Sequence, residues 1–268
     1  MKKSLNNKTL IITGASSGIG YDIVKYILNK YNAKIIGIAR NLEKLLKVKE
    51  EFNDRFIPIS LDVSKIEDFN KLVDFIKEKN YEIYGVINCA GVLPKFSLFS
   101  STPREEFFNV LKINFNSIVY SAEKLLPFLR ETNGFMVNVT SSSALCPFAG
   151  VSAYSTSKVA AERFSTILSY EEKKVRITTV MPGFTKTNIM RNQNANEKER
   201  KLIDKMSSSS EKVAKKIVKK ALKGRRRVIV GFDAHMTTIL YKLFPVSAPK
   251  IIGFFLKKSG IGMFKDIF

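Results

Sequence analysis

Residues 10–20 read LIITGASSGIG, an apolar run that leads into a glycine-rich turn and then into an amphipathic segment. The apolar run is typical of a buried strand, and residues 19–29 have the apolar spacing of a helix. Glycines let the chain turn tightly, and the N-terminus of the next helix offers unpaired N–H groups to a pyrophosphate. The spacing is G-x-x-x-G-x-G rather than G-x-G-x-x-G, but strand and helix lie where a dinucleotide site needs them. We therefore expect a dinucleotide to be held by Gly14, Ser16, Ser17, Gly18, Ile19 and Gly20.

The rest of the chain alternates apolar strand patterns with helical patterns and has no internal repeat. After the first strand at 10–13, strands are expected at 34–39, 55–60, 83–88, 135–140, 176–180 and 227–230. After the helix at 19–29, helices are expected at 42–51, 66–77, 104–129, 152–170 and 211–223. Alternation of this kind is typical of a doubly wound α/β fold. We expect a seven-stranded, mostly parallel Rossmann-type sheet with helices on both faces, whose ligand binds beyond the carboxyl ends of the strands.

Length and composition exclude several classes of protein. The chain has 268 residues, enough for one well-buried domain and too few for two, so a single catalytic domain is expected over 1–268. No run approaches the roughly 20 apolar residues of a membrane span, and none precedes the first strand as a signal peptide would. With two cysteines and one histidine, neither a disulfide framework nor a metal site is indicated. A reduced, cytoplasmic compartment is expected.

The formal net charge of +21 is concentrated towards the C-terminus. Residues 211–268 hold fourteen Lys or Arg against three Asp or Glu, which gives 14 − 3 = +11. A solvated helix face and a surface that binds an anionic partner explain this charge equally well. No aromatic-interleaved groove or nucleic-acid module accompanies the charges, so nucleic acid is not an expected partner.

Two segments depart from the strand–helix alternation. Residues 191–210 are polar and follow the sixth strand, so we expect a mobile substrate loop, with a surface loop capped by Ser210 as the alternative. Residues 232–268 form a C-terminal extension beyond the core at 8–231. Within it, 236–244 and 251–258 combine apolar faces with lysines, as interfacial helices do, and one hypothesis is peripheral contact with an anionic membrane at its inner face. Packing over the substrate cleft, a dimer contact and an acidic acyl-carrier protein are the alternatives.

Tyr154 and Lys158 are four residues apart, and Tyr154 lies thirteen residues after Ser141. On a helix, residues i and i+4 share a face, so the phenol and the ammonium should point into the same space. A nearby cation lowers the pKa of a phenol and makes it usable as a proton donor or acceptor. Ser141 at the end of a strand could orient a carbonyl. Downstream of a dinucleotide turn, this trio suits hydride transfer at a C–O centre.

The corner after the second strand reads Ala39, Arg40, Asn41. An acidic residue is expected there when the adenosine ribose has a free 2′-hydroxyl, whereas a guanidinium suits a 2′-phosphate. Arg40 therefore favours NADP(H) over NAD(H), unless its side chain only points into solvent.

Further motifs follow in order along the chain. They are Thr13–Gly20, Asp62–Val63, Asn88–Cys89–Ala90–Gly91, Asn114, Ser141, Tyr154-x-x-x-Lys158 and Pro182–Gly183-x-x-x-Thr187. Together they resemble the short-chain dehydrogenase/reductase family over about residues 8–231. The resemblance implies a homodimer or homotetramer that assembles through the helices bearing Asn114 and Tyr154, although the longer basic tail puts that assembly in question.

The resemblance also implies a role for each matching residue. Tyr154 would be the catalytic acid/base, Ser141 would bind the substrate oxygen, and Lys158 would hold the nicotinamide ribose and lower the pKa of Tyr154. Asn114 would support a water that links Lys158 to solvent. The implied cofactor contacts are Asp62 and Val63 at the adenine, Asn88, Ala90 and Gly91 along the cofactor, and Pro182, Gly183, Thr185 and Thr187 towards the carboxamide and pyrophosphate.

Some of these residues also have a purely structural interpretation. Asp62 could be a turn or capping residue, Asn114 a polar core residue, and Pro182–Gly183 a break after a strand. Cys89 replaces an asparagine of the family pattern, and we expect a small buried cysteine without a redox role. Thr185 stands where an aliphatic residue is common.

The function expected is an NADP(H)-dependent oxidoreductase that transfers a hydride between nicotinamide and a carbonyl or alcohol group. Apolar residues in 92–99, 144–151 and 184–194 indicate an apolar, lipid-like or acyl substrate; they are Leu93, Phe96, Leu98, Phe99, Leu145, Phe148 and Phe184. The alternative is a regulator that senses NADPH without turnover, which would have no need of the proton-transfer residues.

Overall fold

Seven strands form one parallel sheet in the order β3-β2-β1-β4-β5-β6-β9. The computed structural model describes residues 4–187, 189, 193, 196–259, 261–264 and 267. The strands are β1 Thr9–Thr13, β2 Lys34–Ala39, β3 Phe56–Ser60, β4 Ile83–Asn88, β5 Phe135–Val139, β6 Arg176–Pro182 and β9 Arg227–Val230. The expected Rossmann-type α/β sheet is confirmed, and it is parallel throughout.

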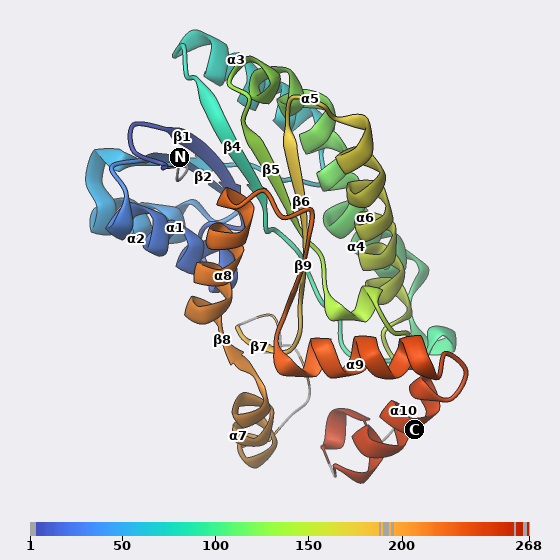
Figure 1. Cartoon of the computed structure of the whole chain (residues 1–268). Helices are drawn as coiled ribbons and strands as arrows, with labels where there is room; N and C mark the ends of the chain where they lie inside the picture. The colour runs from blue at the N-terminus through green and yellow to red at the C-terminus, as the bar shows by residue number, and fades with distance from the viewer. Residues whose placement is uncertain are drawn as a thin grey trace.

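Helices cover both faces of the sheet (Figure 1). One layer holds α1 Gly18–Lys30, α2 Leu42–Phe52 and α8 Ser210–Leu222, and the other holds α3 Ile66–Glu78, α4 Arg104–Leu111, α5 Ser117–Glu131 and α6 Ser152–Glu171. Because successive residues of a strand point to opposite faces, Leu10 and Ile12 of β1 pack into the first layer and Ile11 into the second. The sheet is therefore buried on both sides, which explains its nearly continuous apolar strands.

The strand order reverses beside β1, whose neighbours are β2 and β4. After β1 the chain forms β2 and β3 on one side of β1, and it then crosses to form β4 on the other side. The loops that follow β1 and β4 therefore run in opposite directions and separate. Thr13 at the end of β1 lies in register with Asn88 at the end of β4. In doubly wound sheets the ligand crevice forms at such a reversal.

The long helix expected at 104–129 is divided into α4 and α5. Between them, Lys112–Asn116 forms a π-helical turn, η3, which carries Asn114. The Asn114 side chain accepts a hydrogen bond from Val92 N–H (2.8 Å) and donates to the Val92 carbonyl (2.9 Å). A π-turn changes the direction of the side chains on a helix and is frequent at functional sites. The turn thus coincides with the point at which this helix is bonded to the chain that follows β4.

Residues 191–210 contain a helix, α7 Glu197–Met206, where a loop was expected. Its N-terminus is a capping box: Asn196 Oδ1 accepts from Glu199 N–H, and the Glu199 carboxylate accepts from Asn196 N–H. Short strands flank the segment, since β7 Thr185–Lys186 pairs with β8 Ser208–Ser209. The cap of α8 is Ser209 and not Ser210. Residues 191, 192, 194 and 195 lie outside the described part of the chain, and movement of the segment stays a prediction.

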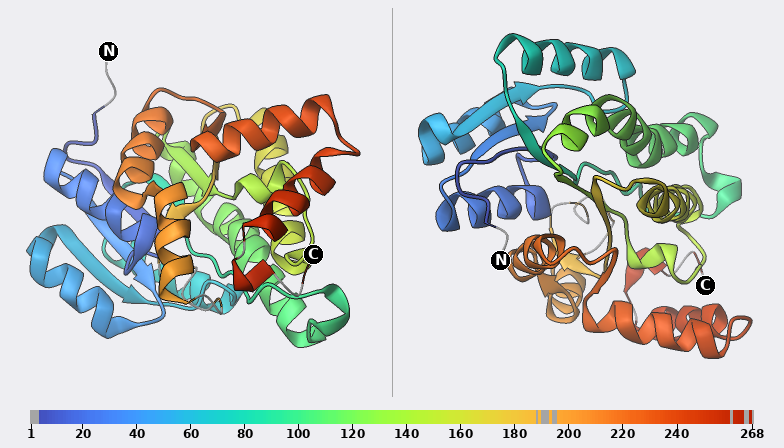
Figure 2. Two further views of the ribbon diagram at one scale, coloured as in Figure 1. Left: turned by 90° about the horizontal axis from the view of Figure 1, so that it is seen from below. Right: turned by 45° about the horizontal axis from the view of Figure 1, so that its top comes forward.

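The C-terminal extension forms α9 Phe232–Leu243, α10 Ala248–Lys258 and a 3-10 turn, η6 Gly262–Phe264. Figures 1 and 2 show α9 and α10 beyond the carboxyl ends of the central strands, at the edge of the molecule. The Phe264 ring lies 5.2 Å from that of Phe96, and Gly262 N–H donates to Glu199 at 2.6 Å. The extension therefore packs beyond the carboxyl ends of the central strands. None of the helices in the described ranges is both long enough and apolar enough to span a membrane.

Candidate active site

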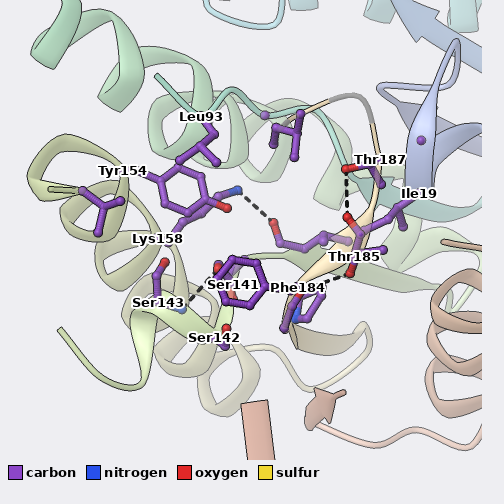
Figure 3. A pocket seen from close by; sticks show the side chains of 18 of the residues that line it. Ile19, Leu93, Ser141, Ser142, Ser143, Tyr154, Lys158, Phe184, Thr185 and Thr187 are labelled. Carbon is purple, nitrogen blue, oxygen red and sulfur yellow. Dashed lines mark hydrogen bonds between the residues drawn. The ribbon is translucent and has the colours of Figure 1, made fainter. Parts of the chain in front are cut away.

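A cavity of about 410 Å³ lies at the carboxyl ends of β1, β4, β5 and β6. It is lined by the glycine turn, by the chain after β4, by the serines after β5 and by the chain after β6. Figure 3 shows Tyr154, Lys158 and Ser141 on one side and Ile19, Thr185 and Thr187 on the other. The structure thus brings the expected catalytic residues and the expected cofactor residues to one space.

The glycine turn has the geometry of an anion cradle. Gly14 has φ +70°, and a Cβ at Gly20 would lie 2.2 Å from the Gly14 carbonyl oxygen, so any side chain there would block the turn. Ser17, the N-cap of α1, makes no side-chain capping bond, and the first turn of α1 has no acidic residue. The N–H groups of this turn therefore remain available to a bound pyrophosphate. Ser16 belongs to the same turn but does not line the cavity.

The chain after β4 is tied to the turn and leaves room beside Lys158. Thr13 Oγ1 accepts hydrogen bonds from the N–H groups of Cys89 (3.0 Å) and Ala90 (3.1 Å). A Cβ at Gly91 would lie 3.3 Å from Lys158 Nζ, so glycine keeps that space open. Asn88 lies off the cavity and donates to Asn138 at 2.8 Å, within the buried sheet. A contact between Asn88 and the cofactor stays a prediction.

The catalytic trio comes from two elements. Ser141 follows β5 and caps the short 3-10 turn η4 Ser142–Ala144, where its hydroxyl accepts from Ser143 N–H at 3.1 Å. Tyr154 and Lys158 lie on the first turns of α6 and both face the cavity. Lys158 is only 4% exposed, and its Nζ donates to the Val139 carbonyl at 3.3 Å. The i, i+4 spacing therefore places phenol and ammonium as the sequence predicts.

Burial shifts the pKa values of Tyr154 and Lys158. It raises the pKa of Tyr154 above its ordinary 10.0, against the opposing hydrogen bond with Ser141. It lowers the pKa of Lys158 from 10.5 to about 8, with the nearby Cys89 acting weakly in the other direction. The net shift of the Tyr154 pKa is therefore upward, because loss of water outweighs the hydrogen bond with Ser141. Lys158 Nζ lies over the Tyr154 ring, 5.7 Å from its centroid, and a lowering of the Tyr154 pKa by this cation stays a prediction. A phenol that keeps its proton at neutral pH is a proton donor.

The Asn114 side chain is held by protein groups, whereas Cys89 is half-buried, not fully buried as expected, and lines the cavity. The fully buried Asn114 side chain bonds Val92 and also donates to Ser157 Oγ at 3.1 Å. Its amide is thus satisfied by protein groups, and support of a water beside Lys158 stays a prediction. Burial raises the pKa of the Cys89 thiol to about 12, which leaves it protonated and unreactive at neutral pH.

The residues expected at the adenosine end lie outside the cavity, at the ends of β2 and β3. The Arg40 side chain is exposed there, while its carbonyl accepts from Ser60 Oγ at 3.0 Å. Asp62 Oδ1 accepts from both the N–H (3.0 Å) and the hydroxyl (2.8 Å) of Ser64. The alternative role of Asp62 in a turn is therefore present, and its contact with adenine, like that of Val63, stays a prediction.

The far end of the cavity is apolar. Of the expected wall residues, Leu93, Phe96, Phe148 and Phe184 line it. Leu98 and Phe99 do not, since they are 44% and 70% exposed on the surface, and Leu145 is also absent from the lining. Further apolar lining comes from Cys146, Val151 and Ile189, which lie within the expected wall segments, and from two residues outside those segments, Ile252 and Leu256. The last two belong to α10, so the extension completes the pocket.

Two polar residues that the sequence did not reveal hold the walls in place. Asp233 on α9 accepts a hydrogen bond from Phe184 N–H at 2.7 Å, and a Cβ at Gly183 would lie 2.1 Å from its carboxylate. Buried Gln193 donates to the Pro94 carbonyl (2.8 Å) and accepts from Phe96 N–H (3.0 Å). The sequence contains one signal for Asp233, because an acidic residue in the first turn of a helix after the last strand is typical of a capping position. It contains no signal for Gln193, because the hydrogen-bond partners of this side chain are almost a hundred residues away.

Residues 8–198 match the short chain dehydrogenase family. This is more than half of the chain, which therefore belongs to the short-chain dehydrogenase/reductase family, oxidoreductases that act on alcohol and carbonyl groups with NAD(P)(H).

Individual relatives span most of the chain. The (S)-benzoin-forming benzil reductase of Saccharomyces cerevisiae is 31% identical over 194 residues, 69% of this chain and 74% of that protein. The 3-ketodihydrosphingosine reductase of Mus musculus is 29% identical over 245 residues, 86% of this chain and 73% of the relative. A short-chain dehydrogenase from Burkholderia cenocepacia, solved in complex with NADP, is 20% identical and shares the fold with a TM-score of 0.78, covering 91% and 96% of the two chains.

Proposed function

We propose that this protein is an NADPH-dependent carbonyl reductase that acts on an apolar ketone or aldehyde. The observation that carries the proposal is that one cavity has an anion cradle at one end, Ser141, Tyr154 and Lys158 at its side, and apolar walls at the other end. A cofactor held by the glycine turn and a substrate held by the apolar walls would meet at the trio.

A dinucleotide with its pyrophosphate held at the glycine turn would supply the hydride for the carbonyl carbon. Tyr154, whose pKa burial raises, keeps its proton at neutral pH and gives it to the carbonyl oxygen. The Ser141 hydroxyl donates to the same oxygen and stabilises the negative charge that develops on it. Lys158, with a pKa of about 8, is mostly protonated at neutral pH and stabilises the phenolate that remains.

The cofactor preference rests on Arg40. Its exposed guanidinium follows β2, where a carboxylate would repel a 2′-phosphate, and neither Ala39 nor Asn41 is acidic. Asn41 instead caps α2 by accepting from Lys44 N–H at 2.8 Å. A guanidinium forms charge-assisted hydrogen bonds with phosphate, so we propose NADPH over NADH. The NADP bound in the Burkholderia cenocepacia relative is consistent with this choice.

The substrate class rests on the walls. The Phe96 ring stacks on that of Phe148 with their centroids 6.4 Å apart. The Phe264 ring also packs against Phe96, in an edge-to-face arrangement. A flat or chain-like apolar group would bury its surface against these rings. The names of the two enzyme relatives, benzil reductase and 3-ketodihydrosphingosine reductase, include one aromatic and one long-chain ketone, which supports an apolar carbonyl substrate here.

The test is NADPH oxidation with a panel of aryl ketones, long-chain ketones, aldehydes and 3-oxoacyl thioesters, repeated with NADH. Cofactor affinity is measured separately by fluorescence titration. Turnover with apolar carbonyls that prefers NADPH supports the proposal. Tight NADPH binding without turnover on any member of the panel would instead identify a cofactor-binding sensor, and absence of binding would refute both interpretations.

A further inference from the structure

The C-terminal helices carry about half of the exposed large hydrophobic side chains on the described residues. Nine of the seventeen exposed large hydrophobic side chains on the described residues lie between positions 232 and 255. They are Phe232, Met236, Ile239, Leu243, Phe244, Val246, Ile251, Phe254 and Phe255, which we call the interfacial face. Scattered apolar residues are normal on a protein surface, but exposed apolar side chains gathered on two consecutive helices and the turn between them indicate an interaction site.

The spacing shows that these side chains form stripes. On α9, Phe232, Met236, Ile239 and Leu243 follow one another at intervals of four, three and four residues, which is one side of a helix. The opposite side of α9, with Ala234 and Thr238, is buried against the protein. Figure 2 shows α9 along the outside of the molecule in both views. One side of the helix is therefore occupied by the fold and the other is left apolar and uncovered.

Helix α10 has the same two-sided pattern, and its inner side belongs to the active site. Ile251, Phe254 and Phe255 point outwards, with exposed fractions of 59% and 65% for the two phenylalanines. Ile252 and Leu256, four residues apart on the inner side, line the cavity. A single helix thus separates the substrate pocket from the interfacial face.

The charges around this face are of one sign. Lys242, Lys250, Lys257 and Lys258 are exposed, and Lys258 Nζ lies 5.8 Å from the centroid of the Phe254 ring. Between residues 232 and 264 the only carboxylate in the sequence is Asp233, which is engaged with Phe184 N–H. Apolar side chains surrounded by lysines are the composition of helices that lie in the interface of anionic membranes.

We infer that the interfacial face docks on an anionic lipid membrane, with α9 and α10 lying in the plane of the interface. A second copy of the chain fits less well, because a two-fold contact would bring the same four lysines against each other. The docking does not depend on catalysis. If the proposed function also holds, docking places the α10 wall of the pocket against the lipid phase, so that an apolar ketone dissolved in the bilayer enters without crossing water.

A tryptophan reporter tests the orientation, since the chain contains no tryptophan. In Phe254→Trp, we expect the emission to shift to the blue when vesicles of phosphatidylcholine and phosphatidylglycerol are added, and to shift much less with phosphatidylcholine alone. The control is Tyr170→Trp. Tyr170 is 62% exposed and lies at the C-terminal end of α6, far along that helix from Tyr154 and beside the amino ends of the strands. The emission of this control should not shift when either kind of vesicle is added. No shift at position 254, or equal shifts at both positions, overturns the inference.

Co-sedimentation with the same vesicles tests the energetics. Phe254→Ser combined with Phe255→Ser should weaken binding at least tenfold, whereas Leu42→Ser combined with Leu46→Ser, which removes two exposed apolar residues from α2, should leave it unchanged. Wild-type binding should also weaken as salt is raised. Equal binding by both double variants overturns the inference, as does a blue shift of the reporter with protein concentration alone, which would indicate self-association. Reduction of a water-soluble ketone by the Phe variant separates a docking failure from a failure of the proposed function.

Discussion

Replacing Lys158 by methionine should abolish activity and yet stabilise the protein at neutral pH. Burial lowers the pKa of Lys158 from 10.5 to about 8, a difference of 10.5 − 8 = 2.5 pH units. At about 1.4 kcal/mol per unit, holding this ammonium inside the folded protein costs on the order of 3 kcal/mol at pH 7. The lost hydrogen bond to the Val139 carbonyl offsets about 1 kcal/mol of this. We therefore expect Lys158→Met to raise the free energy of unfolding by about 2 kcal/mol.

The pH dependence gives the sharper test. A depressed lysine pKa destabilises the folded state fully below pH 8, and the cost falls as pH rises from 8 towards 10.5, so by pH 9.5 it is roughly 1.5 kcal/mol. Cys89, with a pKa of about 12, and Tyr154, with a raised pKa, stay largely protonated over this range. Urea denaturation at pH 7 and 9.5 measures the gap between variant and wild type, with the exposed Lys219→Met as control. A variant less stable at pH 7, or a gap that does not shrink with pH, would refute the reasoning.

Three further predictions concern the cofactor, the loop after β6 and the proton. Arg40→Glu should lower kcat/KM with NADPH tenfold or more and leave NADH nearly unaffected, because a carboxylate repels the 2′-phosphate; a uniform loss with both cofactors contradicts this role. Asp233→Ala leaves Phe184 N–H without its acceptor, at a cost of about 1–3 kcal/mol, and should raise KM for NADPH, whereas Asp233→Asn, which keeps an acceptor oxygen, should restore it. The rate of ketone reduction should fall as pH rises through about 8, where Lys158 loses its proton, and a flat kcat profile from pH 7 to 9.5 would exclude this lysine as the titrating group.

The sequence was sufficient for those parts of the structure that depend on local spacing. The strand-turn-helix at residues 10–20 and the i, i+4 pair on α6 are determined within a few residues of chain, so the fold and the position of the trio followed directly. The capping box Asn196-x-x-Glu199 is also a local signal, and it lies within a polar segment in which a loop was expected.

The features that were not predicted all depend on contacts between distant segments or on depth in the fold. The direction of the Tyr154 pKa shift follows from burial, which spacing does not reveal. Whether an apolar loop residue points inwards, as Phe96 does, or outwards, as Phe99 does, is set by partners such as Gln193 and Phe264 far along the chain. The contribution of α10 to the pocket arises in the same way, since the sequence of the extension left several placements open.

The central claim is that Tyr154 gives the proton to the substrate oxygen, and one measurement tests it most directly. Single-turnover oxidation of bound NADPH by the best ketone of the panel is compared between the wild-type protein and Tyr154→Phe, with NADPH affinity measured for both. We predict a loss of at least a thousandfold in the rate, about 4 kcal/mol, with NADPH affinity unchanged within a few fold. A variant that keeps a rate near that of the wild type would contradict the account.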